Sequence, residues 1–379
     1  NNLALAEILA VYGEKSIKNI VGGYIEMELP EFTQADLNKL GGVIGVFEVI
    51  EKVVDEDINV EQGILNAIAD NERTGKVTLS VLSNYLDKSS ITQMLKKIKV
   101  LLKGEKSLRY LENDSTAAKL GAGFMNGKLV EVLAYKYNEF NYLAKLVALQ
   151  DINSYSFRDF KKPYRDAKLG MLPPKLSQMM INIAGNKDGI LYDPFCGTGT
   201  ILMEGMLMGR KVQGSDLELV NKEGSDKNLE WLNFKFGLGQ ELPKVFVKDA
   251  TKLEALDLDG VTAVASEGYL GKPKRAVETD RDLINELEEL GNMYFAFMKA
   301  LAKGLAQPCN VVLCLPVYNK KGKNYFIENL VEKLPALGYS VSALLPELKN
   351  LGVNFKESLL YKRESQLVYR QIIKFTYTP

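Results

Sequence analysis

The chain has 379 residues, of which 46% are hydrophobic and 25% charged, with 48 basic residues, 48 acidic residues and no histidine. This length exceeds what one hydrophobic core usually serves, so we expect two or three domains. The absence of histidine excludes Ser-His-Asp triads, Cys-His pairs and histidine-based metal sites, and we predict no metal site. A net charge of zero gives no whole-molecule reason to expect nucleic acid as a partner.

The three cysteines, Cys196, Cys309 and Cys314, show no CxxC spacing and cannot form a disulfide framework. They fit a reducing compartment. No run of eighteen apolar residues and no signal peptide is evident, so we expect a cytoplasmic protein without a membrane partner. The chain begins at Asn1, and we expect that native N-terminal sequence precedes it.

The N-terminal half mixes short predicted helices and strands, which indicates small α+β units up to residue 150. The helix expected over 91–103 has Ser90 as its predicted N-cap and a basic outer face. A polar, basic connector over 151–170 follows. The other predicted elements of this half are a helix at 3–11, a strand at 43–54, a helix at 63–69 and a strand at 76–82.

From residue 171 apolar strands alternate with helical segments, a rhythm that predicts a doubly wound, mainly parallel α/β sheet. Near 339–345 and 366–376 two strands follow each other without a crossover helix, so one of them should run antiparallel. The remaining strands are expected at 189–192, 211–214, 244–248, 261–265 and 310–316, with helices at 200–209, 223–235, 277–305 and 324–334.

The strongest motif is DPFCGTGT at 193–200, between a predicted strand and a predicted helix. Gly197 and Gly199 allow a tight turn at the carboxyl end of the strand, where open α/β sheets bind cofactors. Leu202 stands where a dinucleotide fingerprint has its third glycine, and the Gly-Lys-Ser/Thr of a Walker loop is absent. S-adenosylmethionine, which carries no phosphate, is the remaining common ligand of such a turn.

Acidic residues end three successive strands behind this turn. We expect Asp193 to bind the amino-acid end of the cofactor, Asp216 the ribose hydroxyls and Asp249 the adenine amine. The alternative is a glycine-rich turn beside three solvated acids. Pro173 and Pro174 predict a rigid turn into a helix, and Cys196 is expected to be structural. The predicted cofactor-binding set is Leu172, Pro173, Asp193, Pro194, Phe195, Cys196, Gly197, Thr198, Gly199, Thr200, Asp216, Asp249 and Ala250.

DPFCGTGTILMEG, together with RDAKLGMLPPKLSQMMINIAG at 165–185, resembles the THUMP-domain RNA methyltransferases of the tRNA guanosine-10 N2-methyltransferase type. LALAEILAV, LGGVIGVFEVI and LLYKRESQLVYRQI extend the resemblance over nearly the whole chain. It implies a Rossmann-like class I methyltransferase domain at 171–379, with one antiparallel strand. Ahead of it the resemblance implies a ferredoxin-like unit at 1–56 that lacks its first strand, a THUMP domain at 57–150 and the connector at 151–170.

The chain departs from this family in the acceptor loop after the fourth strand, where the family carries Asn/Asp/Ser-Pro-Pro-Tyr and this sequence reads Ser266-Glu267-Gly268-Tyr269. The resemblance implies that these are the catalytic residues. Ser266 and Glu267 would accept the two amine hydrogens of the target base, and Tyr269 would stack on it. Because Gly268 replaces a proline, we expect a less rigid loop.

The neutral total conceals segregated charge. Residues 91–110 hold six basic residues against one acid, residues 156–175 hold six against two, and 48–73 hold eight acids against two basic residues. The two basic segments, one in the THUMP region and one in the connector, predict contacts with RNA phosphates. The alternative is a solvated helix face. The predicted RNA-binding residues are Lys96, Lys97, Lys99, Lys103, Arg109, Arg158, Lys161, Lys162 and Arg165.

The resemblance therefore predicts an S-adenosylmethionine-dependent enzyme that methylates the exocyclic N2 of a guanine in tRNA. Three alternatives stay open: N2-guanine methylation at another tRNA or rRNA site, a DNA amino-methyltransferase, and a catalytically weakened RNA-binding protein that retains the cofactor fold. The expected partner is tRNA or another structured RNA. A small activator subunit is left open, and without one we expect a monomer.

Overall fold

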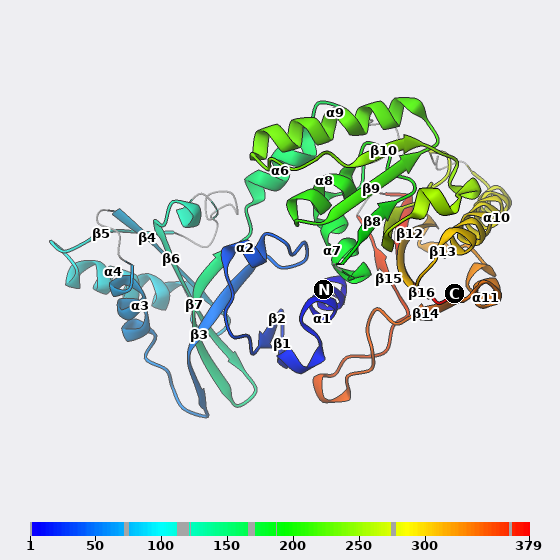
Figure 1. The fold of residues 1–379 in the computed structure, drawn as a ribbon. Coiled ribbons are helices and arrows are strands. Elements are labelled where there is room, and N and C mark those ends of the chain that lie inside the picture. The colour runs from blue at the N-terminus through cyan, green and yellow to red at the C-terminus, as the bar shows by residue number, and fades with distance from the viewer. Residues whose placement is uncertain are drawn as a thin grey trace. The chain divides into compact units, whose positions relative to one another are not determined.

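The computed structural model describes residues 2–71, 76–111, 121, 123–165, 171–186, 188–273, 278–363 and 366–379. The chain divides into two compact units, which are described separately below (Figure 1). Unit 1 comprises Asn1–Lys18, Lys39–Gly42 and Arg158–Pro379, and unit 2 comprises Asn19–Asn38 and Val43–Phe157. Within the described ranges, every helix is too short or too polar to cross a membrane.

Unit 1 is built on a mainly parallel sheet. Its strand order is β10 (Lys244–Val247), β9 (Lys211–Asp216), β8 (Ile190–Asp193), β11 (Val261–Glu267), β12 (Cys309–Lys320), β16 (Val368–Tyr377) and β14 (Tyr339–Ser342). The first five strands run parallel to their neighbours, whereas β16 is antiparallel to both β12 and β14. The prediction that one of the last two strands is reversed is therefore confirmed.

Helices cover both faces of this sheet, which explains why its strands are continuous apolar runs. Along β12, Val311 and Leu313 belong to one core cluster with Tyr294 of α10 (Asp280–Gly304). The next residue, Cys314, faces the other side of the sheet, where its Sγ lies 3.3 Å from Met180 Sδ of α7 (Pro174–Ala184). The further helical segments of unit 1 are α8 (Thr200–Leu207), α9 (Leu219–Phe236), α11 (Leu330–Lys333), η2 (Ala250–Lys252), η3 (Ala255–Leu258), η4 (Leu334–Leu337) and η5 (Lys349–Leu351).

The N-terminal helix α1 (Asn2–Tyr12) packs on α7 in unit 1 and is followed by η1 (Glu14–Ser16). Glu7 is fully buried, where its carboxylate accepts hydrogen bonds from the backbone N–H groups of Gly41 and Gly42, both at 2.8 Å, and from the Asn182 amide at 2.8 Å. Burial raises the pKa of Glu7 to about 7. The compact units thus divide the predicted segment 1–56, whose identity as a ferredoxin-like unit stays a prediction.

Unit 2 contains a five-stranded sheet in the order β3 (Gly45–Val54), β7 (Phe140–Leu149), β6 (Leu129–Tyr137), β4 (Lys76–Ser83) and β5 (Ser107–Tyr110). Helices α3 (Val60–Ala69) and α4 (Lys88–Leu101) bury Ile64, Ile68, Leu95 and Ile98 in one cluster with strand residues such as Leu79. β1 (Ile17–Val21), which spans the division between the units, pairs with β2 (Tyr24–Met27), and α2 (Gln34–Leu37) follows. The predicted mixture of short helices and strands is confirmed.

Two local predictions were wrong. The N-cap of α4 is Asp87, whose carboxylate accepts from the Ser90 N–H at 2.9 Å, so Ser90 lies inside the first turn. The segment 324–334, predicted as one helix, starts in the strand β13 (Lys323–Tyr325), which forms a hairpin with β12 through Lys321 and Gly322. Another strand, β15 (Ser358–Tyr361), pairs antiparallel with β16. The first part of the predicted connector forms the helix α6 (Ile152–Phe160). The connector residues 166–170, including Lys168, lie outside the described part of the chain.

Candidate functional site

The glycine turn, residues Asp193–Thr200, joins β8 to α8 as predicted. Gly197 and Gly199 have φ values of 51° and 80°, in the left-handed region that favours glycine. A Cβ on Gly199 would lie 2.5 Å from Ser225 Oγ, whereas a Cβ on Gly197 would meet no atom within 4 Å. The turn is therefore packed against α9 on one side and open at Gly197.

Two of the predicted cofactor-binding side chains of the turn pack in or against the core. The ring of Phe195 lies 5.1 Å from that of Phe297, and Cys196 is 5% exposed. Cys196 N–H also donates to the Ser215 carbonyl at 2.9 Å. Cys196 thus has the structural role that we predicted. The Cys196 side chain is buried, whereas Phe195 is only partly buried, so a contact of Phe195 with the cofactor stays a prediction.

Asp216 binds the glycine turn directly. Its carboxylate accepts from Gly197 N–H at 2.9 Å, from Glu218 N–H at 3.0 Å and from the Asn221 amide at 3.0 Å. A carboxylate has about four acceptor positions. Asp216 therefore fixes the backbone at the open side of the turn, and about one acceptor position is left for a ribose hydroxyl.

Asp249, at the end of the next strand along the chain, caps η2 through hydrogen bonds from the N–H and hydroxyl of Thr251 at 2.9 and 2.7 Å. The bond from the Thr251 hydroxyl lowers the pKa of Asp249, which stays ionised. Ala250 is buried at the start of η2, and Leu172 and Pro173 are buried where the chain enters α7. Their contacts with a cofactor stay predictions.

Asp193 joins the glycine turn to the acceptor loop. It is 2% exposed, and its Oδ1 accepts from Ser266 Oγ at 2.6 Å and from Phe195 N–H at 3.2 Å. Among the described residues, its Oδ2 has no hydrogen-bond partner. Burial raises the pKa of Asp193 to about 7. The Ser266 hydroxyl donates to Asp193 and keeps its acceptor lone pairs, but Ser266 is fully buried, so its role as an acceptor for a base amine stays a prediction.

Glu267, the last residue of β11, forms a buried ion pair that the sequence did not reveal. Its carboxylate accepts a hydrogen bond from Arg370 Nε on β16, and the two side chains are only 15% and 6% exposed. Burial raises the pKa of Glu267, and the Arg370 guanidinium opposes that shift. The pair fixes the carboxylate at the point where the acceptor loop begins.

Two buried tyrosines hold the acceptor loop. Tyr294 Oη donates to the Tyr269 carbonyl at 3.0 Å, and a Cβ on Gly268 would lie 2.2 Å from the same hydroxyl. Tyr318 Oη donates to the Leu270 carbonyl at 3.0 Å. Glycine at 268 permits close contact with a fully buried ring, and the expectation that it loosens the loop stays a prediction. Tyr269 itself is 46% exposed, as a stacking residue requires.

The connector strap, which we define as residues Arg158–Arg165, packs on the glycine turn and its helices. Arg158 donates to both carboxylate oxygens of Glu204 in α8, at 2.7 and 3.1 Å, with both residues buried. Lys162 Nζ lies 2.9 Å from Thr200 Oγ1 and 3.4 Å from Thr198 Oγ1 and is 4% exposed. The prediction that Arg158 and Lys162 contact RNA is wrong, since both charges are inside unit 1.

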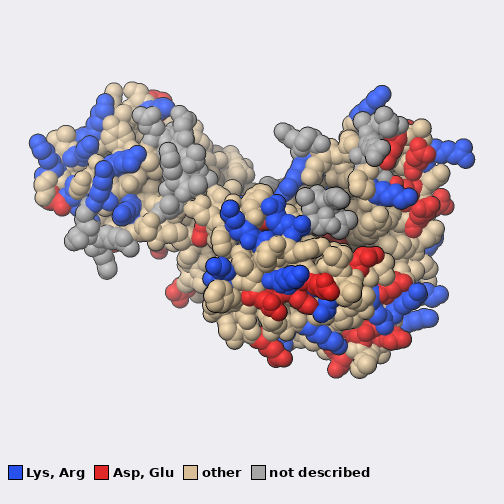
Figure 2. Space-filling model, turned by 90° about the horizontal axis from the view of Figure 1, so that it is seen from above, with Lys and Arg blue, Asp and Glu red and all other residues tan. Residues whose placement is uncertain are grey.

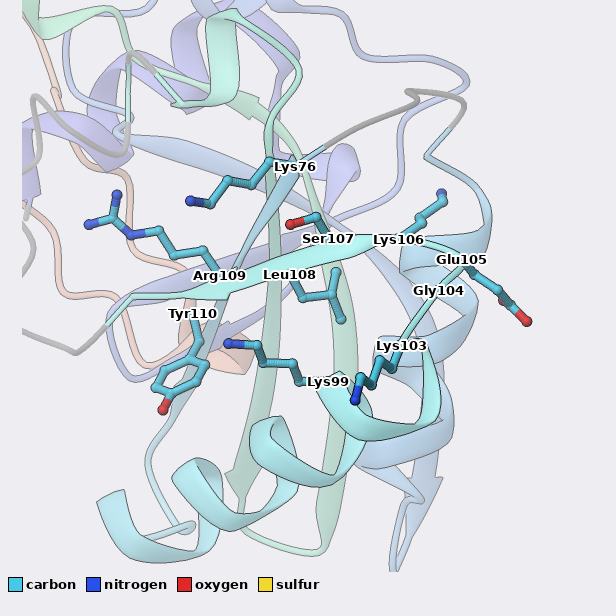
Figure 3. Close-up of a pocket in the computed structure, with 10 residues that line it drawn as sticks. All are labelled: Lys76, Lys99, Lys103, Gly104, Glu105, Lys106, Ser107, Leu108, Arg109 and Tyr110. Carbon is cyan, nitrogen blue, oxygen red and sulfur yellow. The ribbon is translucent and has the colours of Figure 1, made fainter.

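Unit 2 presents a separate basic pocket of about 710 Å³, lined by Lys76, Lys99, Lys103, Lys106 and Arg109, with one acid, Glu105. Figure 3 shows Lys76 and Arg109 extending in the same direction from the neighbouring strands β4 and β5. In Figure 2, Lys and Arg side chains gather over this end of unit 2. The structure thus brings together three predicted RNA-binding residues, Lys99, Lys103 and Arg109, and adds Lys76.

The remaining predicted RNA-binding residues lie apart from the pocket lining. Lys97 forms an ion pair with Glu61 of α3 at 2.9 Å, and Lys96 is exposed on α4. Lys161 and Arg165 are exposed on the strap, where Arg165 lies over the Phe160 ring at 5.4 Å. Lys106, although it lines the pocket, donates to the carbonyls of Ile68 and Asn71, both at 2.7 Å.

Comparisons with known proteins agree with this site. Residues 162–260, which include the glycine turn, match a family model described as "RMKL-like, methyltransferase domain". With the order of the parallel strands, this match shows that unit 1 contains a Rossmann-like class I methyltransferase domain.

Curated relatives carry more specific names. A tRNA (guanine(10)-N2)-dimethyltransferase of Methanocaldococcus jannaschii is 32% identical over 139 residues, which cover 35% of this chain and 39% of the relative. One of Methanothermobacter thermautotrophicus is 47% identical over 62 residues, 16% of this chain and 18% of the relative. A tRNA (guanine(10)-N(2))-methyltransferase of Saccharomyces cerevisiae is 32% identical over 114 residues, which cover 29% of this chain and 26% of the relative. The predicted resemblance is confirmed, although the matched segments span less than two-fifths of each of these relatives.

Proposed function

We propose that this protein is an S-adenosylmethionine-dependent methyltransferase that modifies the exocyclic N2 of a guanine in tRNA. The observation that carries the proposal is the 2.6 Å hydrogen bond from Ser266 to Asp193. It joins the glycine turn after β8 to the acceptor loop after β11, and these two strands are parallel neighbours. A cofactor turn and an acceptor loop therefore meet at one edge of the sheet, as methyl transfer requires.

The residues at this edge fit S-adenosylmethionine. The open side of Gly197 gives the backbone room to approach a ligand, and Asp193 Oδ2 can accept from an ammonium group. Asp216 and Asp249 are the candidates to accept from the ribose and the adenine amine. Bound there, S-adenosylmethionine supplies an electrophilic methyl group on its sulfonium centre.

The acceptor loop orients the guanine. The N2 lone pair of guanine is delocalised into the ring, so acceptors that hold the amine hydrogens draw it toward the methyl group and fix the line of attack. Because Ser266 is fully buried, we assign this role to the carbonyl or carboxylate of Glu267, held by Arg370. The ring of Tyr269 stacks on the extruded base. The methylated nitrogen loses its proton readily, so no histidine base is needed.

Unit 2 supplies affinity for tRNA in this proposal. Its basic pocket offers charges for phosphate groups without reading the base sequence. Lys161 and Arg165, exposed on the strap, supply further phosphate contacts. The assignment of unit 2 as a THUMP domain, suggested by the resemblance, is part of this proposal.

Unmodified tRNA transcripts incubated with methyl-labelled S-adenosylmethionine test the function. After digestion, we expect the label in N2-methylguanosine or N2,N2-dimethylguanosine at one position. A matched transcript with inosine at that position lacks the N2 amine and should receive no label. Label in a different nucleoside would contradict the proposal. Tight tRNA binding without transfer would favour the catalytically weakened RNA-binding protein, and transfer only to rRNA fragments would favour the other-site enzyme.

A further inference from the structure

The strap carries a buried positive charge that structural pairing does not use. Three charged side chains are buried where the strap meets α8, namely Arg158, Lys162 and Glu204, each 5% exposed or less. Arg158 occupies both oxygens of Glu204. Among the described residues, no carboxylate lies within ion-pair distance of Lys162 Nζ, whose partners are the two threonine hydroxyls. Arg158 thus pairs directly with Glu204, whereas Asp159 and Glu204 act on Lys162 only from beyond ion-pair distance.

A buried ammonium whose only hydrogen-bond partners are hydroxyl groups is unfavourable, although the carboxylates of Asp159 and Glu204 stabilise its charge from a greater distance. Burial lowers the pKa of Lys162 to about 8, so most molecules still carry the charge at neutral pH. Because neither carboxylate lies within ion-pair distance of Lys162, its ammonium can still bind an anionic ligand directly. The threonine hydroxyls position the ammonium, and its third hydrogen is left for that partner.

The position of Lys162 identifies the kind of anion. Its two hydroxyl partners, Thr198 and Thr200, are at the end of the glycine turn, and Thr200 begins α8. Asp193 begins the same turn, and its Oδ2 has no described hydrogen-bond partner. One short turn therefore has a buried cation at one end and a buried carboxylate oxygen at the other. These charges complement an α-amino acid zwitterion, with its carboxylate at Lys162 and its ammonium at Asp193.

We propose that Lys162 binds the carboxylate of the methionine moiety of the cofactor, opposite Asp193. This inference rests on the proposed function, because it concerns the ligand of the same turn. It makes Lys162 a cofactor-binding residue, although a charge run in the sequence suggested contact with RNA. Arg158 takes both oxygens of Glu204, so Lys162 forms no direct ion pair there and its ammonium can donate to the ligand.

Calorimetric titration with two ligands tests the proposal without measuring activity. S-adenosylmethionine and its decarboxylated analogue share the adenosine, the sulfonium and the amine and differ in the carboxylate. Wild-type protein should bind S-adenosylmethionine about 10- to 100-fold more tightly, the range for a hydrogen bond to a charged group. The variant Lys162→Met should bind S-adenosylmethionine more weakly by a similar factor and bind the decarboxylated analogue with unchanged affinity.

The control is Lys227→Met, the same change at an exposed position of α9, which should bind both ligands like wild type. Equal affinities of wild type for the two ligands would overturn the proposal and leave the proposed function intact, and this comparison needs no variant to fold. The proposal is also overturned if Lys162→Met still prefers S-adenosylmethionine over the decarboxylated analogue by the wild-type factor. Failure of wild type to bind either ligand would instead refute the proposed function.

Discussion

Removing one buried hydroxyl, by Tyr294→Phe, should slow methyl transfer without weakening cofactor binding. Tyr294 is fully buried, and its hydroxyl donates to the Tyr269 carbonyl at 3.0 Å in the acceptor loop. Loss of such a bond costs about 1 kcal/mol, or up to about 3 kcal/mol if the carbonyl stays unsatisfied. If that free energy is lost from the transition state, the rate falls by about 5- to 150-fold.

A matched control separates positioning from general stability. Tyr339 is also buried, and its hydroxyl donates to the Met298 carbonyl at 3.0 Å, in the same core but away from the loop. Tyr339→Phe should lower the melting temperature about as much as Tyr294→Phe while keeping the wild-type rate. The assay is single-turnover transfer at saturating cofactor and tRNA, with the cofactor Kd measured separately. Equal single-turnover rates for the two variants would refute the idea that Tyr294 positions the loop.

Three further predictions concern charge. Glu267→Gln leaves Arg370 without its carboxylate, so the free energy of unfolding measured with denaturant should fall by about 3 kcal/mol. The double variant with Arg370→Gln should regain part of this stability but no methyl transfer. If the losses of stability in the two single variants simply add in the double variant, the pairing is contradicted. The double variant Lys99→Glu and Arg109→Glu should bind tRNA at least about tenfold more weakly than wild type at low salt, and the difference should shrink at high salt. Its Kd for the cofactor should be unchanged. Unchanged affinity for tRNA would argue against the basic pocket as the tRNA-binding surface. Glu7 has a folded pKa of about 7 against 4.5 in the unfolded chain, so the native state keeps a proton that the unfolded state releases. Stability should therefore fall by about 3 kcal/mol as the pH rises from 4.5 to 7, and Glu7→Gln should flatten this dependence when unfolding is measured across that range.

The sequence predicted the parts of the site that depend on local patterns. A parallel strand buried on both faces is a continuous apolar run, and a tight turn after it needs glycine at fixed positions. The strand β8, the glycine turn and the three acids at strand ends could therefore be found without a structure. The hairpin between β12 and β13 was missed although Lys321-Gly322 is a two-residue turn with φ values of 50° and 85°, which is a recognisable signal.

What the sequence could not show are the partners of charges and rings. Arg158 and Lys162 stand in a basic run that resembles a solvated surface, and only the fold places Glu204 and the threonines beside them. Arg370 is 103 residues from Glu267. Tyr294 matched the apolar face of a long helix, so nothing distinguished its hydroxyl from that of any other core tyrosine. Such contacts depend on side chains that are distant in the chain, and their pattern is not periodic.

The position of β16 between β12 and β14 has a consequence for how the protein folds. Both neighbours of β16 in the sheet, β12 and β14, precede it in the chain. The sheet is therefore complete only after β16 has inserted between them. Until then Glu267, at the end of β11, is a carboxylate in an apolar sheet without Arg370. Contacts over such sequence distances form late and slowly. The acceptor loop should therefore acquire its electrostatic balance only in the last step of assembly, when β16 brings Arg370 to Glu267.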